Sequence, residues 1–468
     1  MPRLEGVDFV KGVSITAIVM FHTYEAIYGW VGHDLFGLMP WGLLRGYMID
    51  FSSWESISIG LLRLTCLGYQ GVHIFVVLSG FLQMWASRDR EIRIHDYYFK
   101  RFLRLYPIYW FVVLSVIALN LIVHGVLGAT PTEILLLFFG WAGAGLPFDS
   151  ALWFMGLIIQ LYLVFPFLLI LLKNIGERGF LLVTWIVSVV SLYLLPGPVV
   201  GLFVGGWLFE FCVGMAVANH YTRVEPMLRG FRNIFLLLLA YLTGLMLSNF
   251  KVTWPLGRPL YGIAITLFIW SIYNTAREMK IFSPVRRFFI FMGLIAFPMW
   301  LINQPFMQEY YLLFASPHLT FWNDIVGDPA NFKILPISKF LLVELNYTII
   351  IIALSYILTR LDEEIARKTA AWQLKLQKIQ LPPPSSHPTQ QPPSPRDLSQ
   401  APDTSKIAPP QYSQGEMLQI EKKQLDELLN QNELLISRCR ELLGTEKELK
   451  VRIALLEEKL DSRRDDAS

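Results

Sequence analysis

The sequence has few charged residues and few cysteines for its length. Only 16% of its 468 residues are charged, whereas 54% are hydrophobic and 14% aromatic, a balance too apolar for a soluble chain of this size. Three cysteines, Cys66, Cys212 and Cys439, are too few and too scattered for a disulfide framework or a CxxC metal site. No nucleic-acid motif and no GxSxG nucleophile elbow occurs. We therefore expect an integral membrane protein with no metal site.

Long apolar stretches recur along the first 360 residues and predict an all-α, polytopic bundle of about ten transmembrane helices. The predicted spans are residues 7–28, 66–86, 105–124, 151–172, 179–196, 199–218, 233–250, 256–274, 288–314 and 338–359. The apolar run from Ile134 to Leu146 is a further candidate, for a re-entrant segment.

Basic residues alternate between the loops as expected for a chain with both termini in the cytosol. The predicted inside loops carry Arg88, Arg90, Arg93, Lys100, Arg101, Arg104, Lys173, Arg178, Arg223, Arg229, Arg232, Arg277, Lys280, Arg286 and Arg287. The predicted outside loops hold only Arg45, Arg63, Lys251, Arg258 and Lys333. We expect a multi-pass protein of the cell (plasma or inner) membrane, with its C-terminus inside.

The chain changes character after the last predicted span. Residues 361–380 read as a cytosolic helical extension, and residues 381–415 are rich in Pro, Ser and Gln, a composition typical of a disordered linker. Residues 416–463 carry a leucine at every seventh position, at Leu428, Leu435, Leu442, Leu449 and Leu456. This heptad predicts a cytosolic coiled coil, and Asn432 at an a position favours a homodimer. The alternative is a single amphipathic helix bound to another protein.

The first predicted helix carries a group of polar residues, which are costly in a bilayer and usually functional there. Lys11 and His22 are eleven residues apart, which places them on one face about 16 Å apart along the axis. Asp8 lies one turn before Lys11 and Glu25 one turn after His22, so each carboxylate can pair with its neighbour. We expect a base with an orienting partner. The alternative is that Lys11 snorkels to the interface and His22 bonds a neighbouring carbonyl.

Two further clusters stand out. Lys100, Arg101 and Arg104 lie where an inside loop enters the third predicted helix, and the two arginines, at i and i+3, can hold phosphate oxygens through their forked donors. The alternative is ordinary positive-inside anchoring. Residues 68–81 form a helix whose small residues Gly71, Ser79 and Gly80 we expect to pack against a neighbour. His73 in that helix is either a proton carrier or simply hydrogen bonded.

These clusters together resemble the integral-membrane acyltransferase 3 family over roughly residues 4–360. Members open with an Asp, then a basic residue and Gly, then a His eleven residues after the basic one. Later motifs are a second helix of the form GVHIFVVLSGF and a third that begins with an aromatic residue, two Arg three apart and a Pro. The matching residues are Asp8, Lys11, Gly12 and His22, residues 71–81, and Phe99, Arg101, Arg104 and Pro107.

The fourth-helix and penultimate-helix signatures of the family are also similar to stretches of this chain, at residues 152–166 and 299–305. The sequence departs from the usual pattern at His73, which replaces an acidic residue, at Ile159 and Gln160, where many members carry Glu, and at Asn303, where many carry His.

The resemblance implies acyl transfer from cytosolic acyl-coenzyme A, most simply acetyl-coenzyme A, to a hydroxyl of a glycan or other cell-surface molecule. Arg101, Arg104 and Lys100 would hold the donor's phosphates, and Lys11 would assist them. His22, supported by Asp8 and Glu25, would act as general base or as nucleophile. The co-substrate is not a permanently bound cofactor. Two other classes remain open from the residues alone: a secondary transporter with a His/Lys proton relay, and a membrane scaffold clustered by its coiled coil.

Overall fold

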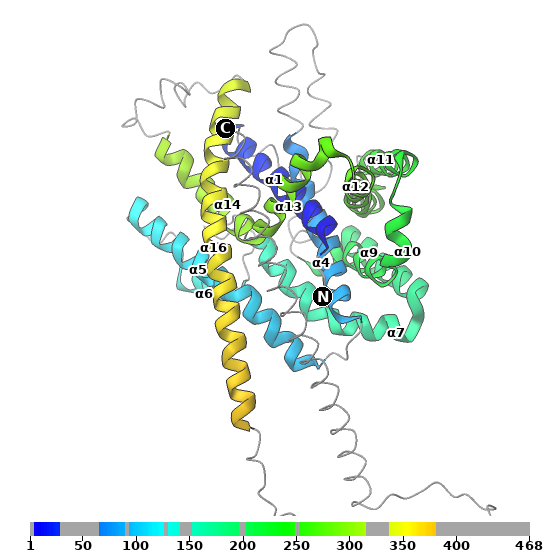
Figure 1. Ribbon diagram of the computed structural model, residues 1–468, viewed down its shortest axis with the longest axis horizontal. Coiled ribbons are helices and arrows are strands. Elements are labelled where there is room, and N and C mark those ends of the chain that lie inside the picture. Colours follow the sequence, from blue (N-terminus) through cyan, green and yellow to red (C-terminus); the bar gives the residue numbers. More distant parts are fainter. Residues whose placement is uncertain are drawn as a thin grey trace, which may run out of the picture. The chain divides into compact units, whose positions relative to one another are not determined.

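The computed structural model describes residues 4–28, 65–88, 93–125, 130–140, 152–195, 203–248, 250, 252–314 and 337–380. Every regular element in these ranges is helical (Figure 1). The chain divides into two units, Met1–Pro382 and Pro383–Ser468, and all described residues belong to the first. The expected linker and coiled coil lie outside the described residues, so both stay predictions.

The helical elements of the described residues are α-helices and three short 3-10 helices. They are α1 (Glu5–Tyr28), η1 (Thr65–Gln70), α4 (Gly71–Ser87), α5 (Ile94–His124), α6 (Pro131–Phe138), α7 (Trp153–Leu194), η2 (Val204–Trp207), α9 (Leu208–Asn219), α10 (Tyr221–Met227), α11 (Phe231–Leu247), α12 (Trp254–Ala276), η3 (Lys280–Phe282), α13 (Ser283–Leu294), α14 (Ala296–Phe314) and α16 (Ile337–Gln380).

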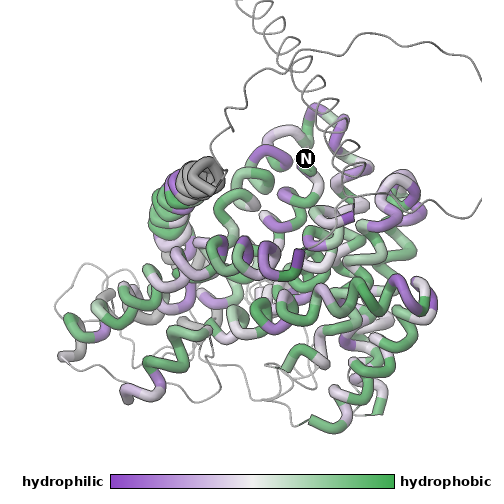
Figure 2. The backbone as a smooth tube through the Cα atoms, turned by 90° about the horizontal axis from the view of Figure 1, so that it is seen from below, coloured by the Kyte–Doolittle hydropathy of each residue, from purple (hydrophilic) through white to green (hydrophobic). Residues whose placement is uncertain are grey.

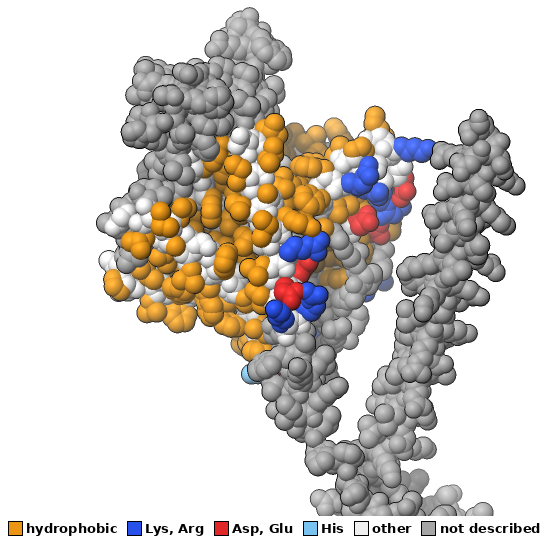
Figure 3. Space-filling model, turned by 60° about the vertical axis from the view of Figure 1, so that its left-hand side comes forward, with side chains coloured by type: hydrophobic (Ala, Val, Ile, Leu, Met, Phe, Trp, Pro, Cys, Tyr) orange, Lys and Arg blue, Asp and Glu red, His pale blue; other side chains and the backbone are white. Residues whose placement is uncertain are grey.

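The exterior of the described bundle has the character of a membrane protein. Four helices are long and apolar enough to cross a bilayer, or up to six if each of two bent helix pairs counts as one span. Hydrophobic residues run along most helices in Figure 2. The face in Figure 3 is almost continuously hydrophobic, with its charged side chains gathered at the margin. An all-helical membrane fold is thus confirmed, whereas the full set of ten spans stays a prediction.

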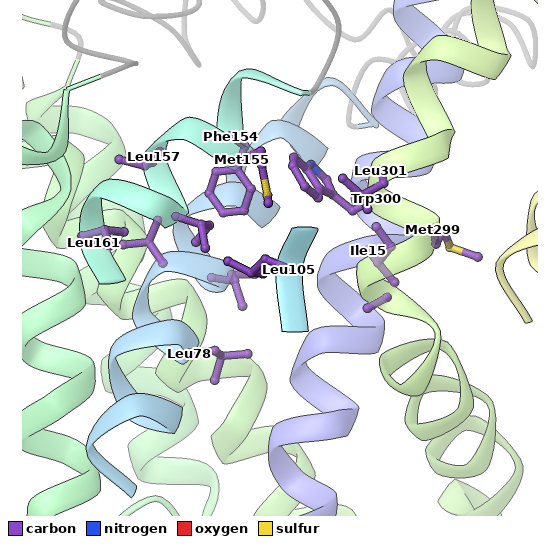
Figure 4. Packing of buried hydrophobic residues seen from close by; sticks show 14 of the residues in the cluster. Ile15, Leu78, Leu105, Phe154, Met155, Leu157, Leu161, Met299, Trp300 and Leu301 are labelled. Atoms are coloured by element: carbon purple, nitrogen blue, oxygen red, sulfur yellow. The ribbon is translucent and has the colours of Figure 1, made fainter. Parts of the chain in front are cut away.

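Most of the described interior is one large hydrophobic cluster contributed by helices far apart in the sequence, and a smaller cluster lies between α11 and α12. Figure 4 shows Ile15 of α1, Leu78 of α4, Leu105 of α5, Phe154 of α7 and Trp300 of α14 within the large cluster. Because helices of a membrane bundle gain little from the hydrophobic effect against one another, close packing of such side chains has to stabilise their association.

Helix α1 lies inside this bundle, against η1, α4, α12, α13, α14 and α16. Its closest neighbour is α13, where glycines on both helices let the backbones touch. A Cβ atom on Gly12 would lie 1.7 Å from the carbonyl oxygen of Phe289, and one on Gly293 would lie 1.8 Å from that of Asp8. Only glycine fits at these crossings, so the sequence fixes how deeply α1 sits in the bundle.

Helices α4 and α9 approach each other in the same way. A Cβ atom on Gly80 would lie 1.9 Å from the carbonyl oxygen of Phe211, and one on Gly214 would lie 2.0 Å from that of Val77. At the other end of α4, Gly71 is packed against Ile18 of α1. The packing roles expected for Gly71 and Gly80 are therefore what the structure shows.

Two long helical elements each contain two of the predicted segments. Element α7 consists of two helices joined by a kink at Gly176, where φ is 70° and ψ is 170°, and these two helices correspond to the fourth and fifth predicted spans. A left-handed φ of this size is accessible to glycine at little cost. Helix α16 covers the last predicted span and the predicted extension at 361–380 without interruption.

Helix α6 is short and is capped at both ends. Thr130 and Glu133 form a reciprocal capping box at its start, with Pro131 in the first turn. At its end the side chains of Tyr109 and Trp110, on α5, donate hydrogen bonds to the carbonyl oxygens of Leu137 and Phe138. Carbonyls that the helix itself leaves unpaired are thereby satisfied. Residues 134–140 of the re-entrant candidate belong to this capped helix and the turn that follows it.

The α4–α9 contact yields a prediction about stability. Gly80→Ala places a methyl group against a backbone carbonyl that cannot move aside, so the variant should be destabilised by about 1–3 kcal/mol, the usual cost of overpacking. Thermal unfolding in detergent measures the effect. Gly179→Ala is the matched control, because its Cβ would make only ordinary contacts of 3.4 Å or more with Ile175. Equal melting temperatures for both variants would contradict the prediction.

Candidate active site

The first polar pair of α1 forms as the sequence predicts. The ammonium Nζ of Lys11 lies 3.0 Å from Oδ1 of Asp8, one turn earlier. Asp8 is buried and Lys11 is half-buried. The two opposite charges neutralise each other, so the pair can lie inside the bundle. The crossing with Gly293 at the backbone of Asp8 holds this turn of α1 in place.

His22 lies three turns further along α1, about 16 Å away by helical rise, and is half-buried beside the ring of Phe21. The next residue, Thr23, is fully buried, lies close to Glu344 of α16, and donates its hydroxyl to the carbonyl oxygen of Val19. The side chain of Glu25 lies outside the described residues, so its predicted pairing with His22 stays a prediction. The described contact with Glu344 of α16 therefore runs through Thr23, the residue next to His22.

The cations at the start of α5 form a cluster in which one member is held firmly. The guanidinium carbon of Arg101 lies 5.3 Å from the ring centre of Tyr97 and 5.6 Å from that of Tyr162 on α7. Two electron-rich ring faces attract a cation and leave its hydrogen-bond donors free to point elsewhere. Arg104 and Lys100 are exposed. The cluster combines one preoriented guanidinium with two mobile cations, an arrangement suited to a polyanion.

A carboxylate on another helix faces this cluster. Asp362 of α16 interacts electrostatically with Arg104. Burial raises the pKa of Asp362, and the positive charge of Arg104 lowers it in part. Asp96, one turn before Lys100 on α5, and Glu363, next to Asp362, are further carboxylates near these cations.

The polar residues of α1 and the cations of α5 are connected through two shared neighbours. Helices α14 and α16 each pack against both α1 and α5. Figure 1 shows α16, the long yellow helix, running beside α14 and α5. One helix, α16, therefore extends from the surroundings of His22, at Glu344, to the cation cluster, at Asp362.

A second buried polar network lies around His73. Its Nδ1 lies 2.9 Å from both carboxylate oxygens of Glu210 on α9, and its Nε2 lies 3.1 Å from the hydroxyl of Tyr261 on α12. His73, Glu210 and Tyr261 are all buried. Of the two interpretations of His73, the hydrogen-bonded one describes what is observed. Sequence reasoning missed Glu210, although an acidic residue within an apolar run was an available signal.

Arg258 corrects the predicted topology. The sequence places it in an outside loop, but it lies inside α12 with 4% of its surface exposed. Its Nη1 donates to the carbonyl oxygen of Gly206 at 2.9 Å, and its guanidinium lies 3.9 Å from the ring centre of Trp207. A cation is tolerated there because a ring face, a carbonyl and the nearby carboxylate of Glu210 replace its hydration.

The match to a known family agrees with the motifs and the fold. The model of an acyltransferase domain family, acyltransferase 3, matches residues 4–360, which is the whole helical part described above up to the start of the polar end of α16. No curated protein and no solved structure matches the chain. On the strength of a family match over more than half of its length, the chain belongs to the acyltransferase 3 family and is a membrane acyltransferase.

Proposed function

We propose that this enzyme transfers an acyl group, with acetyl as the first candidate, from cytosolic acyl-coenzyme A to a hydroxyl of a glycan or other cell-surface molecule. The observation that carries the proposal is the guanidinium of Arg101 between the rings of Tyr97 and Tyr162, with Arg104 beside it. A coenzyme A donor is a polyphosphate with a reactive thioester at the end of a long arm. A preoriented cation cluster on a membrane helix suits its phosphate end.

Arg101 and Arg104 have different surroundings and therefore different roles in binding the donor. Arg101 has little freedom left to lose on binding, so its contact with a phosphate costs less entropy than a contact from a mobile side chain. Arg104 and Lys100 are exposed and adapt to the remaining phosphates. Lys11 contributes less charge to an anion because Asp8 already neutralises it at 3.0 Å.

His22 carries the chemical step in this proposal. As a general base, its neutral imidazole takes the proton of the acceptor hydroxyl while that oxygen attacks the thioester carbonyl. The carbon–sulfur bond then breaks, and coenzyme A leaves as a thiolate that is protonated afterwards. As a nucleophile, the imidazole first receives the acyl group and releases the thiolate, and the acceptor hydroxyl then takes the acyl group from it. Both routes give the same ester and free coenzyme A.

The proposed setting follows from the distribution of basic residues. Both termini lie in the cytosol, the donor binds from that side, and the enzyme resides in the plasma or inner membrane. The heptad leucines at 428–456 pair two copies into a homodimer.

His22→Ala should abolish label transfer from radiolabelled acetyl-coenzyme A into the carbohydrate fraction of membranes that contain the protein. Loss of the base or nucleophile is expected to reduce the rate by at least about a hundredfold. His220→Ala is the matched control, because His220 pairs with Glu177 away from α1. Full transfer by the His22 variant would rule out this role, and no transfer by the wild type, with acetyl- or succinyl-coenzyme A, would rule out the proposed reaction.

Arg101→Ala and Arg104→Ala should raise the apparent KM for acetyl-coenzyme A. Loss of one charge-assisted hydrogen bond costs about 1.5–3 kcal/mol, which corresponds to roughly a tenfold to hundredfold rise. Arg101→Lys should recover little, since an ammonium lacks the planar fork. Initial rates at varied donor concentration provide the measurement. Arg229→Ala, which removes an arginine paired with Glu225, should leave KM unchanged; equal effects from all three sites would indicate a general charge effect instead.

Deletion of residues 416–468 should leave the membrane domain folded but convert the dimer to a monomer. The pairing depends on heptad leucines that all lie in the deleted segment. Light scattering of the purified protein in detergent reports the mass of each form. An unchanged mass would show that the dimer does not form through this segment.

A further inference from the structure

Polar atoms without a hydrogen-bond partner gather where α14 and α16 meet α1. The side chain of Asn303 on α14 is fully buried, and neither its Nδ2 nor its Oδ1 has a partner within the described structure. On α16, Oε2 of Glu344 is also buried and has no partner among the residues that the structure describes. In hydrocarbon or protein interior such atoms destabilise the fold unless something hydrogen bonds to them.

Tyr347 links the backbone of Asn303 to the turn of α16 that carries Glu344. Tyr347 lies one turn after Glu344 on the same buried face of α16, and its hydroxyl donates to the backbone carbonyl of Asn303. The other carboxylate oxygen of Glu344 accepts from Thr348 at 3.0 Å, and Glu344 also lies close to Thr23 of α1. Thr23 directly follows His22. Glu344 therefore lies against the turn of α1 that carries the proposed catalytic residue.

The chemistry of these atoms indicates what they bind. Asn303 offers two donors and an acceptor at one position, and Glu344 offers an acceptor oxygen. A hydroxyl both donates and accepts, so neighbouring hydroxyls of a sugar or polyol can satisfy the amide and the carboxylate together. The ring of Tyr347 packs beside these groups, tilted against the ring of Tyr310 with 5.2 Å between the ring centres.

Charge and distance both distinguish the Asn303/Glu344 pair from the proposed phosphate-binding cations. The unpaired carboxylate oxygen of Glu344 disfavours an anion. Asp362, which faces Arg104, lies eighteen residues after Glu344 on the continuous helix α16, a separation of about 27 Å by helical rise. The phosphate-binding cations and the Asn303/Glu344 pair thus lie almost one membrane thickness apart.

We infer that Asn303 and Glu344 form the acceptor subsite, in which their side chains bind hydroxyl groups of a neutral, polyhydroxylated acceptor and hold one of them toward His22. The inference rests on the proposed acyl transfer and names the acceptor side of that reaction. The acceptor hydroxyl keeps its proton until His22 or the leaving thiolate takes it, because Glu344 and Asn303 only hydrogen bond to it.

The test uses the full chain in membranes, with radiolabelled acetyl-coenzyme A as donor and the membrane carbohydrate fraction as acceptor. Asn303→Leu removes the donor and acceptor atoms while keeping a similar volume, and Glu344→Gln replaces one carboxylate oxygen with a donor. Ser355→Ala is the matched control, because Ser355 is another buried, unpartnered residue on the same helix, eleven residues from Glu344.

Both subsite variants should transfer label at least tenfold more slowly, with the apparent KM for acetyl-coenzyme A within about twofold of the wild type. Ser355→Ala should behave as the wild type. The melting temperature of Asn303→Leu in detergent should be equal to or above that of the wild type, because an apolar side chain replaces an unpaired polar one. A merely structural role for Asn303 predicts the opposite sign.

Three results would contradict the proposal that Asn303 and Glu344 bind the acceptor. Wild-type transfer by Asn303→Leu and Glu344→Gln would show that neither side chain binds the acceptor. A tenfold rise in the KM for acetyl-coenzyme A would assign the pair to the donor's arm. An unfolded Asn303→Leu together with a fully active Glu344→Gln would leave only a structural role. In each case the wild type still transfers label; if the wild type transfers none, the proposed function itself is wrong, and the two failures are thereby distinguished.

Discussion

The structure depends on one constraint: within a bilayer, every polar group has to find its partner inside the protein. The network around His73 meets this constraint completely, because Glu210 of α9 and, from α12, Tyr261 and a ring-supported Arg258 share one buried location. The close helix–helix contacts at glycines meet this constraint in another way. By bringing backbones together they exclude lipid from helix seams and hold polar side chains at fixed depth. Among the described residues, Asn303 and Glu344 are two of those whose buried polar atoms are left without a partner.

Features that depend on residues close in sequence could be predicted. Asp8 and Lys11 pair because residues three apart share a helix face, and the packing role of Gly80 follows from its place among small residues. Helical spans with an apolar exterior follow from composition. The break at Gly176 also lies where the sequence separates two spans, and the helical geometry is interrupted there.

Features that depend on distant residues could not be predicted in the same way. Tyr162, which brackets Arg101, comes from another helix, and no local pattern links the two. Arg258 was misplaced because hydropathy assigns a charge to a loop, whereas three neighbouring groups compensate that charge inside α12. Glu344 was available as an acidic residue in an apolar span. Its proposed role in acceptor binding follows only from its contact with Thr23, the residue after His22.

The capped helix α6 has a consequence for how the protein is made. Its eight residues span only about 12 Å, too little to cross a bilayer, yet Leu135, Leu136 and Phe139 are exposed and apolar. Side chains of α5 supply the hydrogen-bond donors for its last carbonyls. During synthesis α5 leaves the ribosome first, so those donors are in position before α6 emerges. Chain order thus lets a segment too short to insert by itself enter apolar surroundings with its backbone already satisfied.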